Sequence, residues 1–433
     1  MRVISRGLDA LAEGALEGWS AGGMGGRGES HLSAHALMGR VLVFRAVNAE
    51  LANRIAERIR REGPVPFDRY MDAALYEPDL GFFMHGGGAG RSEGDFITSP
   101  EVGSLFGAVV ARALDQWWEA LGRPDPYVVV DAGAGRGQLA RDVLRVGPAC
   151  ATALRYVMVE RSPGLRALQH EYLAIEPPED VLGPAVRHGR DDEPEPVPGT
   201  GPIVTQTETF PAVRFTGVVV ANELLDNLPF RLVERSSDGW HEVRVGIDER
   251  GGFRDILVPA ESELAAEAEG LLPGAQPGQR IPIQTGVAAW LAECGAMLRR
   301  GYVAVIDYAD DCAGLARRGT DSWLRTYRGH ARGGAPLEAP GSQDVTCDVV
   351  LETLHAAAHR EGFEILEQRS QAEWLSCLGI DDLVQEGRRV WTERAHLGDL
   401  EALKGRSRIT ESEALLHPAG LGAHLVVILG RGC

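Results

Sequence analysis

The sequence predicts an α/β fold built on a Rossmann-like parallel sheet, and three observations support this class. Continuous apolar runs of strand length, such as 127–131 and 217–222, are typical of parallel strands that are buried on both faces. Segments with helical spacing, such as 138–146, alternate with these runs along the chain. A glycine-rich turn joins the first run to its helix, as in nucleotide-binding α/β folds. With 433 residues, the chain is long enough to bury such a core without disulfides or metals.

The remaining elements follow in chain order. Residues 47–62 carry apolar side chains at helical spacing, and Gly63-Pro64 ends that helix. Further strands are predicted over 156–160, 302–307, 362–366 and 423–429, and further helices over 163–172 and 286–299. This alternation predicts one parallel sheet with helices on both faces.

Composition narrows the classes of partner. The formal net charge is −18 and the basic residues are almost all arginine, without a clustered basic face, so nucleic acid is not an expected partner. No apolar stretch approaches the length of a membrane span, so no membrane is expected either. The six cysteines are scattered, with neither CxxC pairs nor zinc-type Cys/His spacing, so no metal site is predicted. Together with an N-terminus that resembles no signal or transit peptide, this pattern leads us to expect a cytoplasmic protein.

The turn after the first strand is the strongest sequence signal for a ligand. It reads Asp131-Ala132-Gly133-Ala134-Gly135-Arg136-Gly137, and glycines there let backbone N–H groups and a helix N-terminus approach a nucleotide-like ligand. Gln138 occupies the place of the third glycine of the dinucleotide pattern, which favours S-adenosylmethionine (SAM) over NAD. A purely structural turn is the alternative for such a loop taken alone.

Two polar positions at the ends of later strands strengthen this interpretation. Glu160 ends the second strand, where a carboxylate can accept hydrogen bonds from both ribose hydroxyls of an adenosine cofactor. Asn222 and Glu223 follow the strand at 217–221, at the sheet edge where open α/β enzymes bind ligands. The alternatives are a surface glutamate at 160 and a helix cap at 222–223.

An ordered series of motifs extends over roughly residues 50 to 430, and the series is more specific than any one member. Its members are Phe67-x-x-Tyr70-Met71, Ala74-Leu75-Tyr76-x-Pro78-x-x-Gly81, Gly94-Asp95-Phe96-x-Thr98-Ser99-Pro100-Glu101, the Asp131–Gly137 loop, Asn222-Glu223-x-x-Asp226-x-Leu228-Pro229, Asp307-Tyr308, Thr326-Tyr327-x-x-His330, Pro340-Gly341-x-x-Asp344-Val345-Thr346 and Gln371-x-x-x-Leu375-x-x-x-Gly379-Ile380. In these motifs the sequence resembles the MidA-like class I SAM-dependent methyltransferases, a family that includes the mitochondrial complex I assembly factor that methylates an arginine. It departs from the family pattern at Asp131, usually glutamate, at Ala309, usually glycine, and over 187–212.

The resemblance implies a seven-stranded class I methyltransferase core with an N-terminal segment and substrate-side insertions. Residues 1–45 are then a weakly patterned leader, 46–125 a helical and loop segment covering the cofactor site, and 126–433 the SAM-binding catalytic domain. The spans 230–285, 310–350 and 371–418 are too long for simple connections and are predicted to be insertions beside the site. The expected cofactor-binding residues are Asp131, Gly133, Ala134, Gly135, Gly137, Glu160, Arg161, Thr98, Ser99, Pro100 and Asn222.

The expected reaction is methyl transfer from SAM to nitrogen or oxygen of a protein, a peptide or a biosynthetic intermediate, with protein arginine favoured by the resemblance. A guanidinium acceptor needs carboxylates that orient it and take its proton, and Glu223 and Asp226 are the best-placed candidates, with Asn222 beside them. Asp95, Glu101 and His330 are second choices, although a structural hydrogen bond explains His330 equally well.

Three alternatives remain open at this point. The chain could be an O-methyltransferase of carboxyl or hydroxyl groups on a natural product or peptide, a non-catalytic assembly factor that binds a partner protein, or an NAD-dependent oxidoreductase. The intact loop and Glu160 weigh against the second, and Gln138 weighs against the third. The partners expected are the methyl acceptor and a second copy of the chain in a homodimer.

Overall fold

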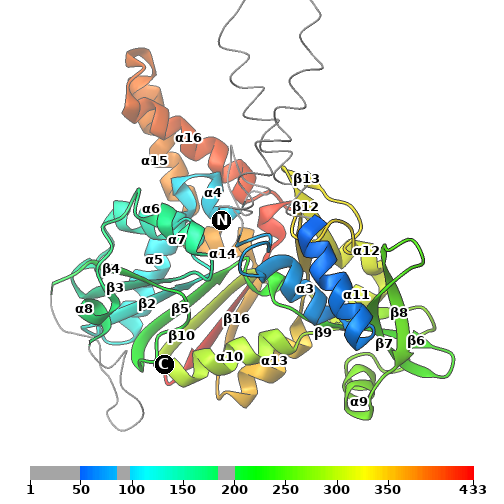
Figure 1. Ribbon diagram of the computed structural model, residues 1–433. Coiled ribbons are helices and arrows are strands. Elements are labelled where there is room, and N and C mark those ends of the chain that lie inside the picture. The colour runs from blue at the N-terminus through cyan, green and yellow to red at the C-terminus, as the bar shows by residue number, and fades with distance from the viewer. Residues whose placement is uncertain (1–48, 85–97, 184–199) are drawn as a thin grey trace, which may run out of the picture. The chain divides into compact units, whose positions relative to one another are not determined.

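The computed structural model describes residues 49–84, 98–183 and 200–433 (Figure 1). The contacts divide the chain into one unit over Met1–Val47 and a second over Asn48–Cys433, and the description concerns the second. The expected leader at 1–45 and the candidate Asp95 therefore lie outside the described residues.

The centre of the second unit is a seven-stranded sheet. Its strands are β2 (Tyr127–Ala132), β3 (Leu154–Val159), β4 (Ile203–Thr207), β5 (Phe215–Asn222), β10 (Leu298–Asp307), β16 (Glu364–Ser370) and β17 (Leu425–Arg431). Their spatial order is β16-β17-β10-β5-β2-β3-β4, and β17 runs antiparallel to both of its neighbours. The five strands from β10 to β4 are parallel. The predicted α/β class with a Rossmann-like sheet is thus confirmed.

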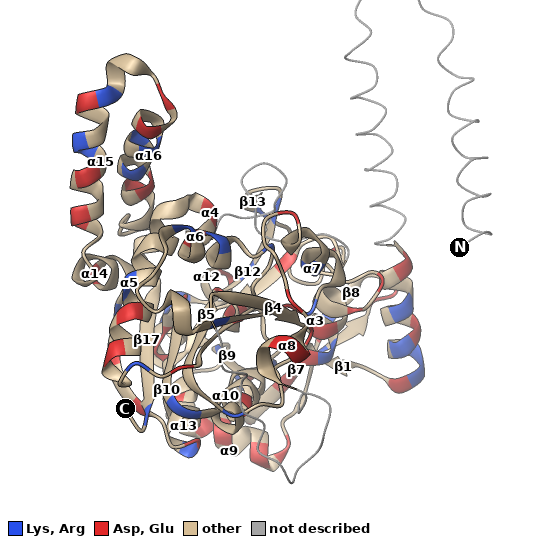
Figure 2. Ribbon diagram, turned by 90° about the vertical axis from the view of Figure 1, so that its left-hand side faces the viewer, with Lys and Arg blue, Asp and Glu red and all other residues tan. Residues whose placement is uncertain are grey.

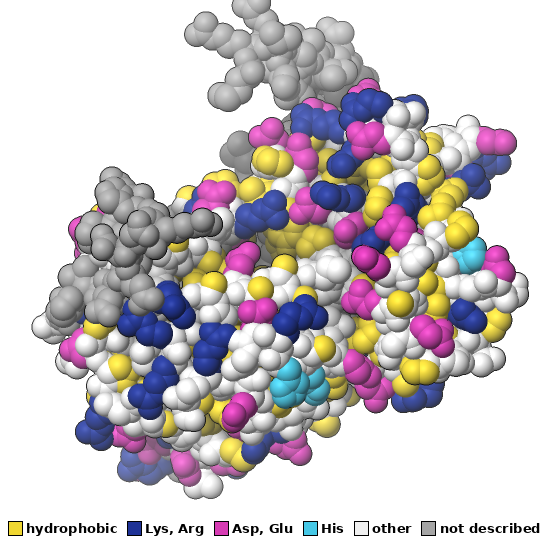
Figure 3. All heavy atoms as spheres, turned by 90° about the horizontal axis from the view of Figure 1, so that it is seen from below, with side chains coloured by type: hydrophobic (Ala, Val, Ile, Leu, Met, Phe, Trp, Pro, Cys, Tyr) yellow, Lys and Arg dark blue, Asp and Glu magenta, His cyan; other side chains and the backbone are white. Residues whose placement is uncertain are grey.

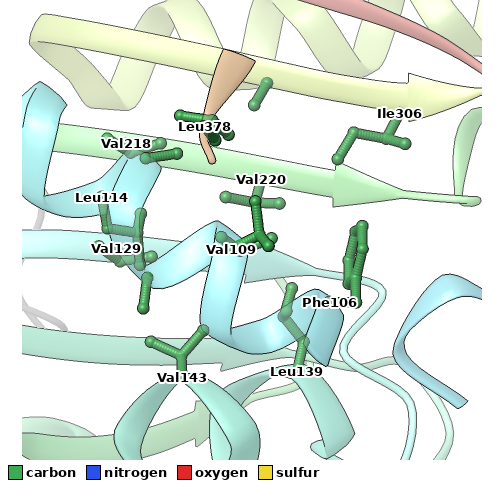
Figure 4. Packing of buried hydrophobic residues seen from close by; sticks show 14 of the residues in the cluster. Phe106, Val109, Leu114, Val129, Leu139, Val143, Val218, Val220, Ile306 and Leu378 are labelled. Carbon is green, nitrogen blue, oxygen red and sulfur yellow. The ribbon is translucent and has the colours of Figure 1, made fainter. Parts of the chain in front are cut away.

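Helices cover both faces of this sheet because successive side chains of each buried strand point to opposite sides. Val129 of β2 and Val218 and Val220 of β5 pack against α5 (Ser104–Ala120) and α6 (Gln138–Val146), as Figure 4 shows. The intervening residues, such as Val128 and Val219, pack against α10 (Thr285–Met297) and α13 (Leu351–Arg360) on the other face. Smaller elements between the strands are η1 (Ala151–Ala153), α7 (Pro163–Gln169), α8 (Pro178–Leu182) and η3 (Leu225–Asn227).

Two core elements were not among those expected from the sequence. The edge strand β4 holds only two apolar residues among threonines and a glutamine, too few for an apolar run. Helix α5 is apolar on nearly all sides over its first three turns, because it is buried between the sheet and other helices, and it therefore lacks a polar stripe. The predicted strands at 362–366 and 423–429 begin two residues earlier than β16 and β17 do.

A second sheet forms from the span 230–285 and from β1 of the N-terminal segment. Its strands are β1 (Val65–Pro66), β6 (Arg231–Ser236), β7 (Gly239–Ile247), β8 (Phe253–Pro259) and β9 (Arg280–Ile283), with α9 (Ser262–Leu271) following β8. Helix α3 (Phe67–Tyr76), which follows the helix over 49–62, packs on this sheet through Phe67 against Phe230 and Tyr70 against Phe253. The sheet therefore fixes the position of α3, whose C-terminal residue Tyr76 reaches the ligand site described below.

The other two long spans form two small sheets and a helical arm. Between β10 and α13 lie β11 (Ala309–Asp310), α11 (Cys312–Arg318), α12 (Thr320–Trp323), β12 (Leu324–Arg328), β13 (Ala331–Arg332), β14 (Asp344–Cys347) and β15 (Val349–Val350). Between β16 and β17 lie α14 (Gln371–Cys377), α15 (Ile380–Arg394), η4 (Ala395–Leu397), α16 (Leu400–Leu415) and η5 (Leu421–Ala423). The short α4 (Ser99–Val102) contacts α16 and α6. Figure 2 shows charges of both signs along the paired helices α15 and α16.

The described surface has mixed charge on the face that Figure 3 presents, where arginines and acidic side chains are interspersed. Such mixing is typical of a solvated protein surface. Among the residues described, no helix combines the length and the apolar character required to span a membrane.

Candidate active site

A cavity of about 350 Å³ opens at the carboxyl ends of β2, β3 and β5. Parallel strands of an open α/β sheet bring their following loops together at this edge, which is where such folds bind ligands. Its wall combines the glycine loop, the ends of three strands, Tyr76 of α3, Pro100 of α4 and Trp290 of α10. The volume is within the range of small-molecule sites.

The glycine loop has the backbone geometry that only glycine adopts readily. Gly133, Gly135 and Gly137 all have positive φ, of 72°, 53° and 76°. A Cβ added to Gly133 would lie 2.9 Å from a methyl carbon of Leu224, whereas one added to Gly135 would meet no atom within 4 Å. Since Gly135 lines the cavity, the space beside its Cα is available to a ligand.

Glu160 holds this loop in place in addition to facing the cavity. Its Oε2 accepts a hydrogen bond from the Gly135 N–H at 2.9 Å and its Oε1 accepts one from the Ser162 N–H at 2.7 Å. Burial raises the pKa of this carboxyl, and the two backbone hydrogen bonds oppose the shift. An ionised carboxylate offers about four acceptor positions, so capacity remains for ribose hydroxyls.

Asp131 and Arg136 add polar groups of opposite sign to the wall. Burial raises the pKa of Asp131 to about 7, although its Oδ2 accepts a hydrogen bond from the Tyr156 hydroxyl at 3.0 Å. The Nε of Arg136 is buried and has no hydrogen-bond partner. A buried donor without a partner on a cavity wall is typical of a ligand contact.

Glu223 is the carboxyl group best placed for chemistry. It follows β5 with a φ of 52°, in the left-handed region where a residue other than glycine is strained. Its Oε1 accepts hydrogen bonds from the Ser99 N–H at 3.0 Å and from the Asn222 Nδ2 at 3.2 Å. Burial raises the pKa of Glu223 to about 8, and the charge of Asp226 adds to the shift. A carboxyl group that ionises near neutral pH suits proton transfer.

The turn that follows, η3, is held by Asp307 at the end of β10. Its Oδ2 accepts hydrogen bonds from the N–H groups of Leu225 at 2.9 Å and Asp226 at 3.3 Å, and its Oδ1 accepts one from the Tyr308 N–H. Burial, with the charges of Asp226 and Glu223, raises the pKa of Asp307 well above its usual value. Burial likewise raises the pKa of Asp226 to about 7, which Arg325 opposes. Three neighbouring carboxyl groups therefore compete for ionisation.

The structure brings most of the predicted site residues together. Those that line the cavity are Thr98, Pro100, Glu101, Asp131, Gly133, Ala134, Gly135, Glu160, Arg161, Asn222 and Glu223. Three predicted residues lie behind the wall: Ser99 donates to Glu223 and Gln371, Gly137 precedes α6, and Asp226 is buried within η3. Asp226 was expected to act with Glu223 on the methyl acceptor, but it does not line the cavity.

His330 does not reach the cavity. It lies with Gly329 in the tight turn between β12 and β13, where it is exposed and has a φ of 62°. The two-residue turn directs the side chain of His330 to solvent. The spacing of the motif gives no sign of this turn.

Several lining residues were missed from the sequence. Thr209 and Phe210 follow β4, so recognising that strand would have placed them at the same sheet edge. Trp290 lies on α10 with a buried indole N–H that has no partner. Tyr76 donates its hydroxyl to the carbonyl of Asn227 at 3.2 Å and stacks under the Arg161 guanidinium at 4.7 Å. Tyr76 belongs to one of the quoted motifs, but no local pattern assigns it or Trp290 to the cavity.

These groups fit an adenosyl cofactor with an amino-acid end. The open space at Gly135 lets a ligand approach the backbone, and Glu160 has acceptor capacity for the ribose hydroxyls. The unpaired donor of Arg136 offers a cation to a carboxylate. Within the three described ranges, no group of three or more His, Cys, Asp or Glu is placed to hold a metal ion.

Comparison with known proteins agrees with this geometry. The model of a family of S-adenosyl-L-methionine-dependent methyltransferases matches residues 109–368. The mitochondrial protein arginine methyltransferase NDUFAF7 of Danio rerio is 30% identical over 78% of this chain and 79% of its own length, and the homologue of Drosophila melanogaster is 30% identical over 73% and 71%. A crystal structure from Burkholderia thailandensis with bound S-adenosyl-homocysteine has a TM-score of 0.74 at 31% identity, over 89% of this chain and 93% of that one.

One expectation is overturned by these relatives. The cytoplasmic location expected from the scattered cysteines and the N-terminus is contradicted, because the curated relatives are mitochondrial proteins. Unpaired thiols are compatible with either compartment, and so could not distinguish them.

The sheet order, the glycine loop with Glu160 and the family match over more than half of the chain agree on cofactor and reaction class. The chain uses SAM as its methyl donor and belongs to the MidA-like family of S-adenosyl-L-methionine-dependent methyltransferases.

Proposed function

We propose that this methyltransferase modifies a guanidinium nitrogen of an arginine in a partner protein. The observation that carries the proposal is Glu223, a buried carboxyl group on the cavity wall whose pKa burial raises to about 8. The curated relatives named protein arginine methyltransferases support the same acceptor.

The chemistry explains why such a carboxyl group is needed. A guanidinium has a pKa above about 12 and holds its lone pairs in a delocalised system, so its nitrogen becomes nucleophilic only as a proton leaves. The bound cofactor supplies an electrophilic methyl group on a sulfonium, which in-line displacement transfers to nitrogen while the electron pair of the broken bond stays on sulfur. Glu223 orients the cation and accepts the proton that the nitrogen loses, a role worth roughly 10²–10⁴ in rate.

The neighbouring groups prepare Glu223 for this role. Ser99 and Asn222 both donate to its Oε1, which leaves Oε2 for the acceptor. The strained φ of 52° fixes the side chain at the cavity wall rather than along the strand. For cofactor binding we assign Thr98, Pro100, Asp131, Gly133, Ala134, Gly135, Glu160, Arg161 and Asn222.

The acceptor can be identified with radiolabelled SAM. The protein is incubated with a mitochondrial protein extract treated to inactivate its own methyltransferases, and labelled proteins are hydrolysed. Label recovered as methylarginine supports the proposal. Label released as methanol by mild base identifies carboxyl methylation instead, and label on tyrosine or serine oxygen identifies hydroxyl methylation.

We also propose that the chain forms a homodimer in solution. Light scattering coupled to size-exclusion chromatography tests this directly, because a monomer has a mass of 46.6 kDa. A single species of that mass at micromolar concentration contradicts the dimer.

A further inference from the structure

Gln371 is the first residue of α14 and opens the last of the sequence motifs, but it does not line the cavity. It is fully buried, and three contacts fix its position. Its N–H donates to the carbonyl of His424 at 2.7 Å, and its Nε2 donates to the carbonyl of Leu415 at 3.3 Å. A capping box formed by Ser370 and Glu373 holds the first turn of α14 around it. Gln371 is therefore a firmly held residue in the insertion between β16 and β17.

The oxygen of the Gln371 amide holds Ser99 of α4. The Oε1 of Gln371 lies 2.9 Å from the Oγ of Ser99, and both side chains are fully buried. A backbone carbonyl only accepts hydrogen bonds, so the amide nitrogen faces Leu415 and the amide oxygen faces Ser99. The Ser99 hydroxyl therefore donates to Gln371, which fixes its direction. Loss of either partner would leave a buried polar group unpaired, which is costly.

The backbone of Ser99 in turn holds Glu223. The Ser99 N–H donates to the Oε1 of Glu223 at 3.0 Å. Pro100 has no N–H, and the N–H of Glu101 donates to the carbonyl of Thr98 at 2.9 Å. At the start of α4, the Ser99 N–H is therefore the donor that remains for Glu223. Two consecutive hydrogen bonds thus connect the buried amide of α14, through Ser99, to the carboxyl group on the cavity wall.

We propose that Gln371 is a positioning residue for methyl transfer: by fixing Ser99, it holds the Oε1 of Glu223 and leaves Oε2 for the acceptor. Without this contact, the Ser99 N–H is no longer held against Glu223, and the carboxyl group is free to rotate away from the geometry that proton transfer requires. A displacement of about 1 Å at a reacting group can lower a rate by about 10²-fold. This inference rests on the proposed role of Glu223.

A contribution to stability alone is the competing explanation, and Glu411 of α16 provides the matched control. Glu411 is buried, and its Oε2 accepts a hydrogen bond from the N–H of Leu105, just beyond α4, at 2.8 Å. Glu411→Gln therefore disturbs a buried contact between the same insertion and the segment after α4, while the contact of Ser99 with Gln371 stays intact. The loss of a negative charge at Glu411 can only lower the pKa of Glu223, so this control cannot imitate a rise.

The experiment follows the titration of Glu223 by NMR of the full-length protein, labelled with carbon-13 at the glutamate carboxyl carbons. The signal of Glu223 is the one that is missing from Glu223→Gln. Burial raises the pKa of Glu223 to about 8, and the hydrogen bond from the Ser99 N–H opposes that shift, so its loss moves the midpoint upward. The other titratable groups that act on Glu223 remain in every variant: Asp226, Asp307 and Tyr308.

Gln371→Met keeps the size of the side chain without its polar atoms, and Ser99→Ala removes only the hydroxyl. Each should raise the midpoint of Glu223 by about 0.5 pH unit or more. The double variant should shift no further than the larger single shift, because both changes break the same contact. Glu411→Gln should leave the midpoint of Glu223 where it is or lower it.

Midpoints within about 0.2 unit of the wild type in folded Gln371→Met and Ser99→Ala overturn the proposal, as do shifts that add in the double variant. An equal rise in Glu411→Gln also overturns it, since the effect would then follow from any loosened contact. If Gln371→Met does not fold, an unchanged midpoint in Ser99→Ala is sufficient to overturn the proposal. The titration needs no methyl acceptor, so a failure to methylate arginine is a separate result.

Discussion

Gly135 illustrates how a single residue can serve both the backbone and the ligand. Its φ of 53° is one that other residues adopt at a cost, and the position of an added Cβ is open only because the cavity lies there. Gly122, after α5, has a φ of 83° and equally open surroundings, but it is exposed and does not line the cavity. A comparison of substitutions at the two glycines therefore distinguishes the cost of backbone strain from the loss of ligand space.

Gly135→Ala should therefore weaken SAM binding by about tenfold or more, because the added methyl group overfills the ligand space. Gly122→Ala should bind SAM like the wild type. Both replacements should lower the unfolding free energy by a similar amount, about 1–2 kcal/mol, the cost of a left-handed alanine. Calorimetric titration and urea unfolding of both variants check this. Equal SAM affinity in the two folded variants would show that the ligand does not approach Gly135.

At the scale of elements, the site depends on the pairing of β5 with β10. Their register places Asn222 beside Ile306, so Asp307 at the end of β10 meets the backbone of η3. Glu223 is held in the same way, since its N–H donates to the carbonyl of Ile306 at 2.8 Å. Two neighbouring strands thus position the loop that carries Glu223, the proposed proton acceptor.

Asp307→Ala should lower the unfolding free energy by about 2 kcal/mol or more, because it leaves buried N–H groups of the turn without acceptors. Asp311, which accepts from the Gly314 N–H at the start of α11, offers a control on an exposed helix terminus. Asp311→Ala should cost only about 1 kcal/mol, as is usual for a helix cap. Denaturant unfolding of both variants compares them. A smaller loss for Asp307→Ala than for Asp311→Ala would contradict the role given to Asp307.

The sequence predicted the elements whose patterning is local and missed those defined by tertiary contacts. The glycine loop and α6 were predictable because strand, turn and helix succeed one another within about 20 residues. The strand β4 was missed because an edge position requires few apolar side chains. The positions of Asp226 and His330 could not be predicted, since each depends on which side of a turn faces the cavity.

At the scale of the whole molecule, several buried carboxyl groups make stability depend on pH. Burial raises the pKa of Asp131 and Asp226 to about 7 and that of Glu223 to about 8, all above their values in an unfolded chain. The folded state therefore binds more protons than the unfolded state between about pH 4 and pH 8, and the stability due to these groups is lost as pH rises through that window.

The cofactor-free protein should accordingly become less stable from pH 5 to pH 8.5, by about 1.4 kcal/mol per pH unit for each proton involved. Asp226→Asn should flatten this dependence, because the amide does not titrate. Unfolding by urea across this range measures both slopes. A stability that increases with pH in the wild type would mean that these carboxyl groups are ionised throughout.

We propose that Glu223 takes the proton during methyl transfer to arginine. The most direct measurement is the single-turnover rate of transfer from labelled SAM to the arginine acceptor at pH 8.5, for the wild type, Glu223→Gln and Glu293→Gln. Glu293 is an exposed glutamate that also lines the cavity, which makes it the matched control. We expect Glu223→Gln to be slower by at least about 10²-fold with S-adenosyl-homocysteine affinity near that of the wild type, and Glu293→Gln to keep a rate within about threefold. A Glu223→Gln rate close to the wild type would contradict the account.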